Sequence, residues 1–224
     1  MTDNSNIAFI CEALTFCDKL TEQDKTLILN NVSVQNYKRG ENIHSYDNDC
    51  VGVLLIKSGE LRAYILSEDG REITLYRLVK GEVCILSASC VLKNITFDVH
   101  IDAEKDSEVL ILNSSVFEQV SSRNIYAENF SNKITVQRFS EVMNAMQQIL
   151  FSSFDKRLAV FLIDEIAQSG TDTISMTHEQ IANYVGSARE VVSRMLKYFE
   201  NIGIVKLSRA KVTIVDKKRL RDFT

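Results

Sequence analysis

Five polar side chains near the C-terminal end of the chain are spaced so that they share one face of a predicted helix. They are Arg189, Glu190, Ser193, Arg194 and Lys197. Arginine pairs with guanine edges, glutamate accepts from cytosine, and lysine and serine reach phosphates. This face therefore offers the chemistry of a helix that enters the major groove of double-stranded DNA. An ordinary amphipathic helix with a solvated charged face has a similar pattern, and that alternative stays open at this point.

Two capping boxes predict where this helix and the helix before it begin. Thr177 with Gln180 marks the first start, and Ser187 with Glu190 marks the second, ten residues further on. Gly186 falls where the first helix must stop and turn, a position that usually requires a positive φ. Two short helices joined in this way have the layout of a helix-turn-helix. The second helix also carries an apolar stripe on its opposite face, made of Val191, Val192, Met195, Leu196 and Phe199.

A β-hairpin with a basic turn is predicted directly after the second helix. Its strands are Val205–Ser208 and Val212–Val215, and Arg209 and Lys211 lie in the turn. Between residues 186 and 221 there are ten Lys or Arg against three Asp or Glu. This one-sided charge, together with a small Ala182 where the two helices must approach closely, favours a winged helix-turn-helix that binds DNA. The candidate DNA-binding residues are Thr177, His178, Ser187, Arg189, Glu190, Ser193, Arg194, Lys197, Arg209 and Lys211.

The run R-E-V-V-S-R, from Arg189 to Arg194, resembles the recognition-helix signature of the Crp/Fnr family. That family includes the cyclic-AMP receptor protein and the fumarate–nitrate reduction regulator. The resemblance implies that Arg189, Glu190, Ser193 and Arg194 contact bases. The first arginine is similar to the cyclic-AMP receptor branch, and the serine before Arg194 is similar to the fumarate–nitrate branch. The sequence of the half-site is therefore related to both branches and follows from neither.

Short runs of β-branched and aromatic residues alternate with turn signals in the first half of the chain. The runs are Val53–Ile56, Leu61–Leu66, Glu72–Leu78, Val99–Ala103 and Glu108–Leu112. Strands at this regular spacing predict an antiparallel β-roll or jelly roll. The stretch from residue 59 to residue 75 resembles the cyclic-nucleotide-binding fold of the same family. Such a resemblance in fold does not determine the ligand.

A long helix is predicted between the two halves, over residues 125–150. Its apolar seam steps alternately by four and three residues, which favours a parallel two-stranded coiled coil and hence a homodimer. A single amphipathic helix packed on its own β-roll needs a similar stripe and is the alternative. A twofold dimer places two recognition helices about 34 Å apart, which fits an inverted-repeat operator. The candidate dimer contacts are Val136, Phe139, Met143, Met146 and Leu150, and the seam also includes Ile125, Asn129 and Asn132, with Ile134, Val142 and Ile149 widening the stripe.

These elements predict an α+β protein with three parts. We expect an effector-sensing β-roll over residues 1–124, a dimerisation helix over 125–150 and a winged helix-turn-helix over 151–224. The net charge of −4 divides into −7 for the first 150 residues and +3 for the rest, so the basic end is expected to dock on DNA. With no signal segment and no apolar run of about 18 residues, a cytoplasmic protein without membrane contact is expected. A regulator of this kind is also expected to act together with RNA polymerase.

The segment that corresponds to the nucleotide pocket lacks the expected charges. In family members that bind cyclic AMP, a Glu holds the ribose hydroxyl and an Arg neutralises the phosphate. Here the Glu position, within the run from Gly81 to Leu92, is apolar, and no arginine lies between Arg77 and Arg123. A buried phosphate without a cation is poorly compensated. The sequence therefore predicts an unknown small effector or signal other than cyclic AMP.

Two cysteines stand where the family's effectors bind. Cys84 and Cys90 are proposed as part of a thiol-based sensing element, coupled to the long helix, although packing as small hydrophobic residues is the alternative. Haem or metal ligation stays a minor option, and the close cysteine spacings of an iron–sulfur cluster are absent. All five cysteines are expected to be thiols. The candidate effector residues are Cys84, Leu86, Cys90, Phe130 and Ile134, with no cofactor assigned.

Two other classes of function are weaker. Jelly rolls also form metal-dependent dioxygenases, which need something like two His and a carboxylate at one site. His44 and His100 are 56 residues apart and no H-x-H is present, so no catalytic or metal-binding residue is predicted and the protein is not expected to be an enzyme. A ligand-binding module that does not bind DNA is the other alternative, and the predicted recognition helix argues against it.

Overall fold

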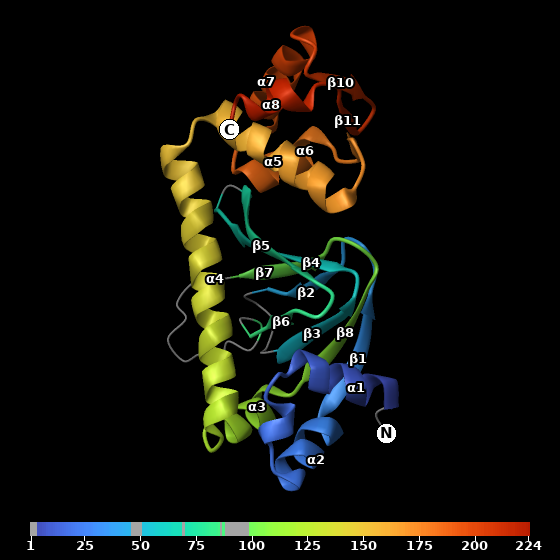
Figure 1. Ribbon diagram of the computed structural model, residues 1–224, viewed down its shortest axis with the longest axis vertical. Coiled ribbons are helices and arrows are strands. Elements are labelled where there is room, and N and C mark those ends of the chain that lie inside the picture. Colours follow the sequence, from blue (N-terminus) through green and yellow to red (C-terminus); the bar gives the residue numbers. More distant parts are fainter. Residues whose placement is uncertain (1–3, 46–50, 69, 86, 88–98) are drawn as a thin grey trace. The chain divides into compact units, whose positions relative to one another are not determined.

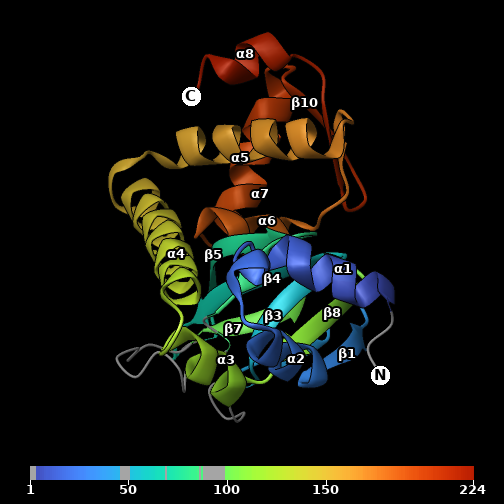
Figure 2. The ribbon, with the colours of Figure 1, turned by 60° about the horizontal axis from the view of Figure 1, so that its bottom comes forward.

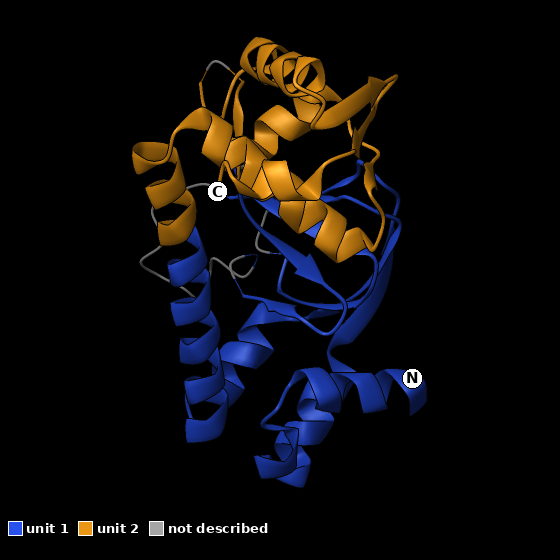
Figure 3. Cartoon of the chain, turned by 45° about the horizontal axis from the view of Figure 1, so that its top comes forward, with its two compact units in different colours: residues 1–66, 75–142 blue, residues 67–74, 143–224 orange. Residues whose placement is uncertain are grey.

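The computed structural model describes residues 4–45, 51–68, 70–85, 87 and 99–224. The chain forms two compact units (Figure 3). One comprises residues 1–66 and 75–142, and the other comprises residues 67–74 and 143–224. Strands dominate the first unit and helices the second, and each unit has its own hydrophobic core, as the predicted α+β class requires.

The first unit is built around two antiparallel sheets of four strands each (Figure 1). Their strand orders are β1-β8-β3-β6 and β2-β7-β4-β5, so the chain crosses between the sheets repeatedly, and the predicted antiparallel β-roll is confirmed. The strands of the first sheet are β1 (Val32–Tyr37), β8 (Ser107–Leu112), β3 (Val53–Ser58) and β6 (Val83–Cys84). The strands of the second sheet are β2 (Asn42–His44), β7 (His100–Ala103), β4 (Glu60–Leu66) and β5 (Glu72–Val79).

Strand β3 is buried on both faces, which explains its continuous apolar run. Leu54 and Ile56 belong to one core cluster, together with residues of β4 and β7 from the other sheet. Val53 and Leu55 belong to a second cluster on the opposite face. Because successive side chains of a strand point to opposite faces, a strand covered on both sides cannot alternate polar and apolar residues.

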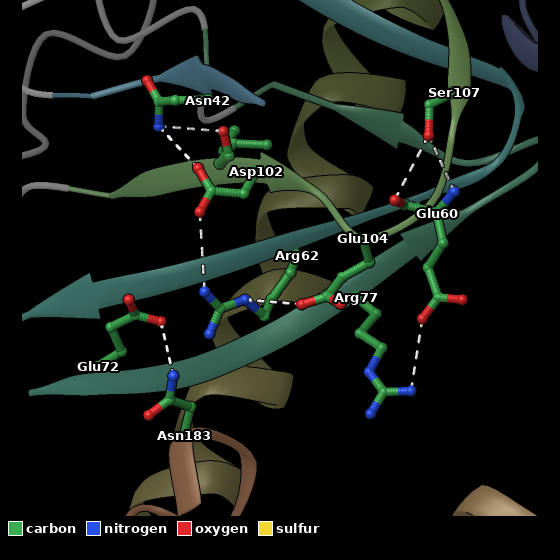
Figure 4. Close-up of polar contacts among 10 residues, drawn as sticks. Asn42, Glu60, Arg62, Glu72, Arg77, Asp102, Glu104, Ser107 and Asn183 are labelled. Atoms are coloured by element: carbon green, nitrogen blue, oxygen red, sulfur yellow. Dashed lines mark hydrogen bonds and ion pairs between the residues drawn. The ribbon is translucent and has the colours of Figure 1, made fainter. Parts of the chain in front are cut away.

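The turn between β3 and β4 requires a glycine. Gly59 has φ of +88°, and a Cβ atom there would lie only 2.1 Å from Ser107 Oγ. This close approach lets the backbone N–H of Glu60 donate to Ser107 Oγ at 3.1 Å (Figure 4). The buried Glu60 carboxylate is in turn neutralised by Lys105 at 2.7 Å and Arg77 at 3.4 Å. The turn thus locks the start of β4 against the start of β8.

Helices that the strand pattern did not predict cover one face of the β1-β8-β3-β6 sheet (Figure 2). They are α1 (Asn4–Ala13), the short 3-10 helix η1 (Cys17–Lys19), α2 (Glu22–Asn30) and α3 (Ser114–Ser121). Thr21 is the N-cap of helix α2, and its hydroxyl oxygen accepts a hydrogen bond from the backbone N–H of Asp24 at 3.1 Å. Ile10, Leu14 and Phe117 are fully buried in the cluster that these helices form with β3 and β8.

Cys11 and Cys17 are joined by a disulfide, with their Cα atoms 5.1 Å apart. This separation lies within the range of about 4.4–6.8 Å that disulfides require. The expectation that all five cysteines are thiols is therefore wrong for this pair. Helix α1 ends at Ala13 and η1 begins at Cys17, so a turn of the chain, rather than a shared helix face, brings the two sulfurs together.

Helix α4 spans Ile125–Phe151, where the heptad pattern predicts a helix. Its inward face packs on the first unit: Ala127, Phe130 and Ile134 join the cluster around α1, and Val142 joins the cluster between the sheets. Ile134 and Val142 therefore face the β-roll. The sequence had suggested that they widen the seam, and they do not. The predicted dimer contacts are solvent-exposed over 43% to 65% of their surface, namely Val136, Phe139, Met143, Met146 and Leu150.

Within the described residues, the second unit contains the end of α4, four further helices and a small sheet. The sheet order is β10-β11-β9, and the hairpin strands start and end close to the predicted residues, with β11 displaced by one. Phe199, Leu196 and Ile181 are fully buried in a core that all these elements share. The elements after α4 are α5 (Phe154–Ser169), β9 (Thr173–Ile174), α6 (His178–Val185), α7 (Arg189–Asn201), β10 (Val205–Ser208), β11 (Lys211–Ile214) and α8 (Lys217–Arg221).

Candidate nucleic-acid interface

The turn between α6 and α7 is set by local hydrogen bonds. Thr177 Oγ1 accepts from the backbone of Gln180 at 3.1 Å, and Gln180 Oε1 accepts from the backbone of Thr177 at 2.9 Å. This is the predicted capping box, and it satisfies two backbone donors at the start of α6. Gly186 ends α6 in the left-handed region, at φ 60° and ψ 54°. The backbone N–H of Ser187 then donates to Ala182 O at 3.0 Å, which turns the chain toward α7.

The second predicted capping box is wrong. Helix α7 begins at Arg189, its N-cap is Ala188, and no side chain caps it. Ser187 still belongs to the turn, because its backbone N–H is bonded to the end of α6. The two helices therefore begin eleven residues apart, at His178 and Arg189. Glu190 lies in the first turn of α7, where a negative charge interacts favourably with the helix dipole.

Helix α7 presents the predicted polar face to solvent. Arg189, Glu190 and Arg194 are exposed, and none of them has a hydrogen bond or ion pair with another described residue. Lys197 differs, because its Nζ lies 2.7 Å from Glu200 Oε2. The opposite face holds the helix in place through Val192, Leu196 and Phe199, all fully buried. A rigidly packed helix with free arginines on its outer face is suited to pairing with an external acceptor.

His178 and Ser193 contact each other between the two helices. His178 Nδ1 lies 2.8 Å from Ser193 Oγ, and both residues are partly buried. Burial lowers the pKa of His178, and the guanidinium of Arg189 lowers it further. The imidazole is therefore neutral around pH 7, and its hydrogen bond holds the Ser193 Oγ atom in place.

The basic wing is connected to α7 through Glu200. Strands β10 and β11 pair up to Ser208 and Lys211, which leaves Arg209 and Ala210 as the turn. Arg209 and Lys211 are exposed and have no hydrogen bond or ion pair within the described residues. Glu200 Oε1 accepts from the backbone of Leu207 at 3.0 Å. The hydrogen bonds from Lys197 and from Leu207 lower the pKa of Glu200, so the link stays ionised at neutral pH.

The predicted effector residues do not form one cluster. Cys84 is a buried thiol on β6, opposite Leu54, in the core between the sheets. Phe130 and Ile134 instead pack against the cluster around α1, on the other face of β3. Leu86 and Cys90 lie outside the described residues. The burial of Cys84 fits the packing role that the sequence left open as its alternative.

A buried arginine that the sequence did not single out lies beside Tyr76. Arg138, on α4, bonds Glu141 at 2.7 Å and Glu82 at 3.3 Å, and its guanidinium lies 4.8 Å from the centre of the Tyr76 ring. Burial, and then the nearby Cys84 thiol, raises the pKa of Tyr76 well above its usual value. The sequence contains no arginine between Arg77 and Arg123, and this buried arginine comes instead from the long helix α4. The sequence offered one signal for this arginine: Arg138 follows Ile134 by four residues, so both lie on the same face of the helix.

His44 and His100 are the histidines of the first unit. Within the described ranges, no group of three or more His, Cys, Asp or Glu is placed to hold a metal ion. His44 is buried, which lowers its pKa, and His100 stacks on Tyr64 with ring centres 5.2 Å apart. Among the described helices, none combines the length and apolar character needed to cross a membrane.

Comparison with known proteins agrees with both halves of this description. The family of Crp-like helix-turn-helix domains matches residues 156–223, and the cyclic nucleotide-binding domain family matches residues 34–124. The chain is similar to a solved structure described as a transcriptional regulator of the Crp/Fnr family from Eubacterium rectale. The two are 46% identical, the match covers 93% of this chain and 96% of the other, and the TM-score is 0.90. The chain belongs to the Crp/Fnr family.

More distant members of the Crp/Fnr family match over most of their length. The anaerobic regulatory protein of Haemophilus influenzae is 23% identical over 234 residues, which cover 98% of this chain and 86% of that protein. The transcriptional regulatory protein btr of Bordetella pertussis is 22% identical over 194 residues, covering 83% and 78% respectively. The protein is thus a DNA-binding transcriptional regulator with an N-terminal sensing domain, in a family of regulators that act as dimers.

Proposed function

We propose that α7 enters the major groove and reads bases through Arg189, Glu190, Ser193 and Arg194. The observation that carries the proposal is the state of Arg189 and Arg194, which are exposed on a rigid helix without an acceptor among the described residues. An arginine in that state can pair bidentately with the O6 and N7 atoms of guanine. Because Ser193 is held by His178, its Oγ atom is presented at a defined position.

Phosphate contacts are proposed for the residues that surround this helix. Thr177, His178 and Ser187 lie at the start and end of α6, and Arg209 and Lys211 lie on the wing. Helix starts and basic turns commonly hold the phosphate backbone and so fix the register of the recognition helix. Lys197 must exchange its partner Glu200 for a phosphate, so it is expected to contribute less than the two wing residues.

The proposed dimer forms through the exposed seam of α4. Val136, Phe139 and Leu150 expose 65%, 64% and 65% of their surface, although all three are apolar. Large apolar side chains repeated along one helix face are stabilised by a second copy of the same helix. We accordingly assign residues 1–124 to sensing, 125–150 to dimerisation and 151–224 to DNA binding.

The signal is proposed to act on the first unit and to be something other than cyclic AMP. The buried Arg138 is already bonded to two carboxylates, so it does not supply an unpaired cation for a cyclic phosphate. Cys84, with Cys90, remains the candidate that the sequence suggests for a thiol-based signal. As a regulator of bacterial type, the protein is proposed to act in the cytoplasm together with RNA polymerase.

Selection of binding sites from random double-stranded DNA tests the proposed reading of bases. The purified full-length protein, tested reduced and oxidised, is expected to enrich an inverted repeat whose half-sites lie one helical turn apart. The Lys218→Ala variant, which removes an exposed charge from α8, is expected to select the same repeat. If no sequence is enriched over competitor DNA in either state, the proposal is wrong.

A further inference from the structure

The disulfide between Cys11 and Cys17 joins two elements at the N-terminal end of the first unit. Cys11 lies on α1 and is partly exposed, whereas Cys17 is the first residue of η1 and is 8% exposed. The chain between them is not a loose surface loop, because Leu14 and Phe16 are buried in the cluster beside the β1-β8-β3-β6 sheet. The bond therefore fixes how α1 and η1 pack on the β-roll.

Two direct contacts connect η1 and the residue before it to the beginning of α4. The ring of Phe16 meets the ring of Phe130 edge to face, with centres 5.1 Å apart. The side chain of Asn124 donates to Lys19 O, on η1, at 3.0 Å. A change in the position of η1 would therefore alter the contacts of Phe130, on the side of α4, and of Asn124, which precedes α4.

Asn124 also caps α4, so the second contact reaches the helix backbone. Its Oδ1 atom accepts from the backbone of Tyr126 at 3.0 Å and of Ala127 at 3.2 Å. Ala127 is fully buried in the same cluster as Phe16. One side chain therefore bonds η1 with its amide nitrogen and the first turn of α4 with its amide oxygen. Displacing Lys19 O removes one half of this arrangement and loosens the cap.

We propose that Cys11 and Cys17 form a thiol–disulfide switch that controls how the first turn of α4 is held. The disulfide state keeps η1 against Phe130 and Asn124. The dithiol state releases the covalent constraint between α1 and η1, so that Phe16 and Lys19 are held by packing alone. Because α4 is the proposed dimer helix, the two states differ in DNA affinity, a consequence that rests on the proposed function.

The chemistry needs only a small thiol and its disulfide, such as glutathione in its two forms. A thiolate attacks Sγ of Cys11, the more exposed of the two residues, and Cys17 leaves as a thiolate that takes up a proton. A second thiolate then attacks the small-molecule sulfur of the mixed disulfide. The bond to Cys11 breaks, Cys11 leaves as a thiolate that takes up a proton, and the oxidised small molecule is released. Two thiols are oxidised to one disulfide and the protein disulfide is reduced to two thiols. The reverse sequence restores the bond.

The first experiment measures the switch without DNA. The full-length protein is equilibrated in glutathione buffers of different ratio, alkylated, and analysed by mass spectrometry for the peptide containing both cysteines. Amide hydrogen exchange is measured in the same samples. We expect reversible conversion between the two states, and at least severalfold faster exchange for residues 125–131 in the dithiol state. Failure of the pair to form the bond, or equal exchange in both states, overturns the proposal.

The second experiment measures DNA affinity on a selected operator. We expect about a tenfold difference between the two states of the wild type, within the range typical of allosteric coupling. The Cys11→Ser, Cys17→Ser double variant should lose the response. If the wild type binds the operator with equal affinity in both states, the proposal that the switch controls DNA binding is wrong.

The two proposals fail in different ways. If the protein selects no DNA sequence, the proposed reading of bases fails, while hydrogen exchange still decides whether the switch reaches α4. If the double variant does not fold, the wild-type exchange and affinity measurements decide the matter alone. A response that persists in a folded double variant assigns the signal to other cysteines and overturns the proposal.

Discussion

The imidazole of His178 and the hydroxyl of Ser193 lie 2.8 Å apart, which connects the first residue of α6 to the exposed edge of α7. Neither residue belongs to the shared core of the second unit. Their hydrogen bond is instead a polar link at the surface proposed to meet DNA, so that the serine is positioned by another helix. Two predicted contact residues are therefore expected to act as a pair.

Titration of His178 should make stability depend on pH. Its pKa is lower in the folded protein than in the unfolded chain, because burial and Arg189 disfavour the charged imidazole. The unfolded chain then binds more protons near the ordinary histidine pKa of about 6.5, so stability falls as the pH drops through that region. We expect the loss of thermal stability between pH 7.5 and 5.5 to be smaller in His178→Gln. Equal losses in the two proteins would contradict this assignment, since His44 and His100 are present in both.

Replacing Arg194 by Ala should relax base preference at one base pair of each half-site. Arg194 is exposed and has no partner within the described residues, so its removal leaves the fold of the second unit intact. The expected cost in binding is about 1–3 kcal/mol on the preferred sequence. Competition assays with operators altered at single positions measure this. An equal loss on all sequences would instead make Arg194 a phosphate contact.

Replacing Arg209 or Lys211 by Ala should weaken binding on every sequence alike. Both side chains are exposed on the wing, whereas its core contacts are made by other residues, Val205, Val212 and Ile214. Each lost phosphate contact reduces the slope of log affinity against log salt concentration by about 0.9 for duplex DNA. Titrations at several salt concentrations give this slope. An unchanged slope together with changed base preference would show that the wing reads bases.

A charge in the seam of α4 should separate the dimer. Phe139→Asp places a carboxylate on a position that is 64% exposed in the single chain. If a second helix covers this position, burying the charge without a partner is strongly unfavourable. Sedimentation should then show a monomer, whereas Gln137→Asp, on an exposed position outside the seam, should remain dimeric. A dimeric Phe139→Asp variant would place the interface elsewhere.

Cyclic AMP should not control this regulator. The buried guanidinium of Arg138, on the part of α4 that belongs to the first unit, is already bonded to Glu82 and Glu141. Calorimetric titration of the purified protein is expected to give no binding stronger than millimolar. Micromolar binding that also raised DNA affinity would overturn the expectation, and DNA would then have to tighten the nucleotide by the same factor.

The elements of the second unit could be predicted because their signals are local. A capping box, a glycine in the left-handed region and an apolar stripe each act within a few residues, and Thr177, Gly186 and Leu196 have the predicted roles. The same reasoning failed at Ser187, where a competing backbone hydrogen bond to Ala182 keeps the serine in the turn. A cap pattern does not reveal which backbone donors are already satisfied.

The amino-acid sequence by itself determined the fold class, the recognition-helix face and the helical seam, because each follows from the period of apolar residues. Only the tertiary structure decided what meets across long sequence distances. It brought Cys11 to Cys17 through a turn, placed Arg138 beside Tyr76, and assigned Ile134 to the cluster around α1 and Cys84 to the core between the sheets. These contacts depend on which face of β3 each element covers, and a strand that is apolar on both faces does not encode that choice.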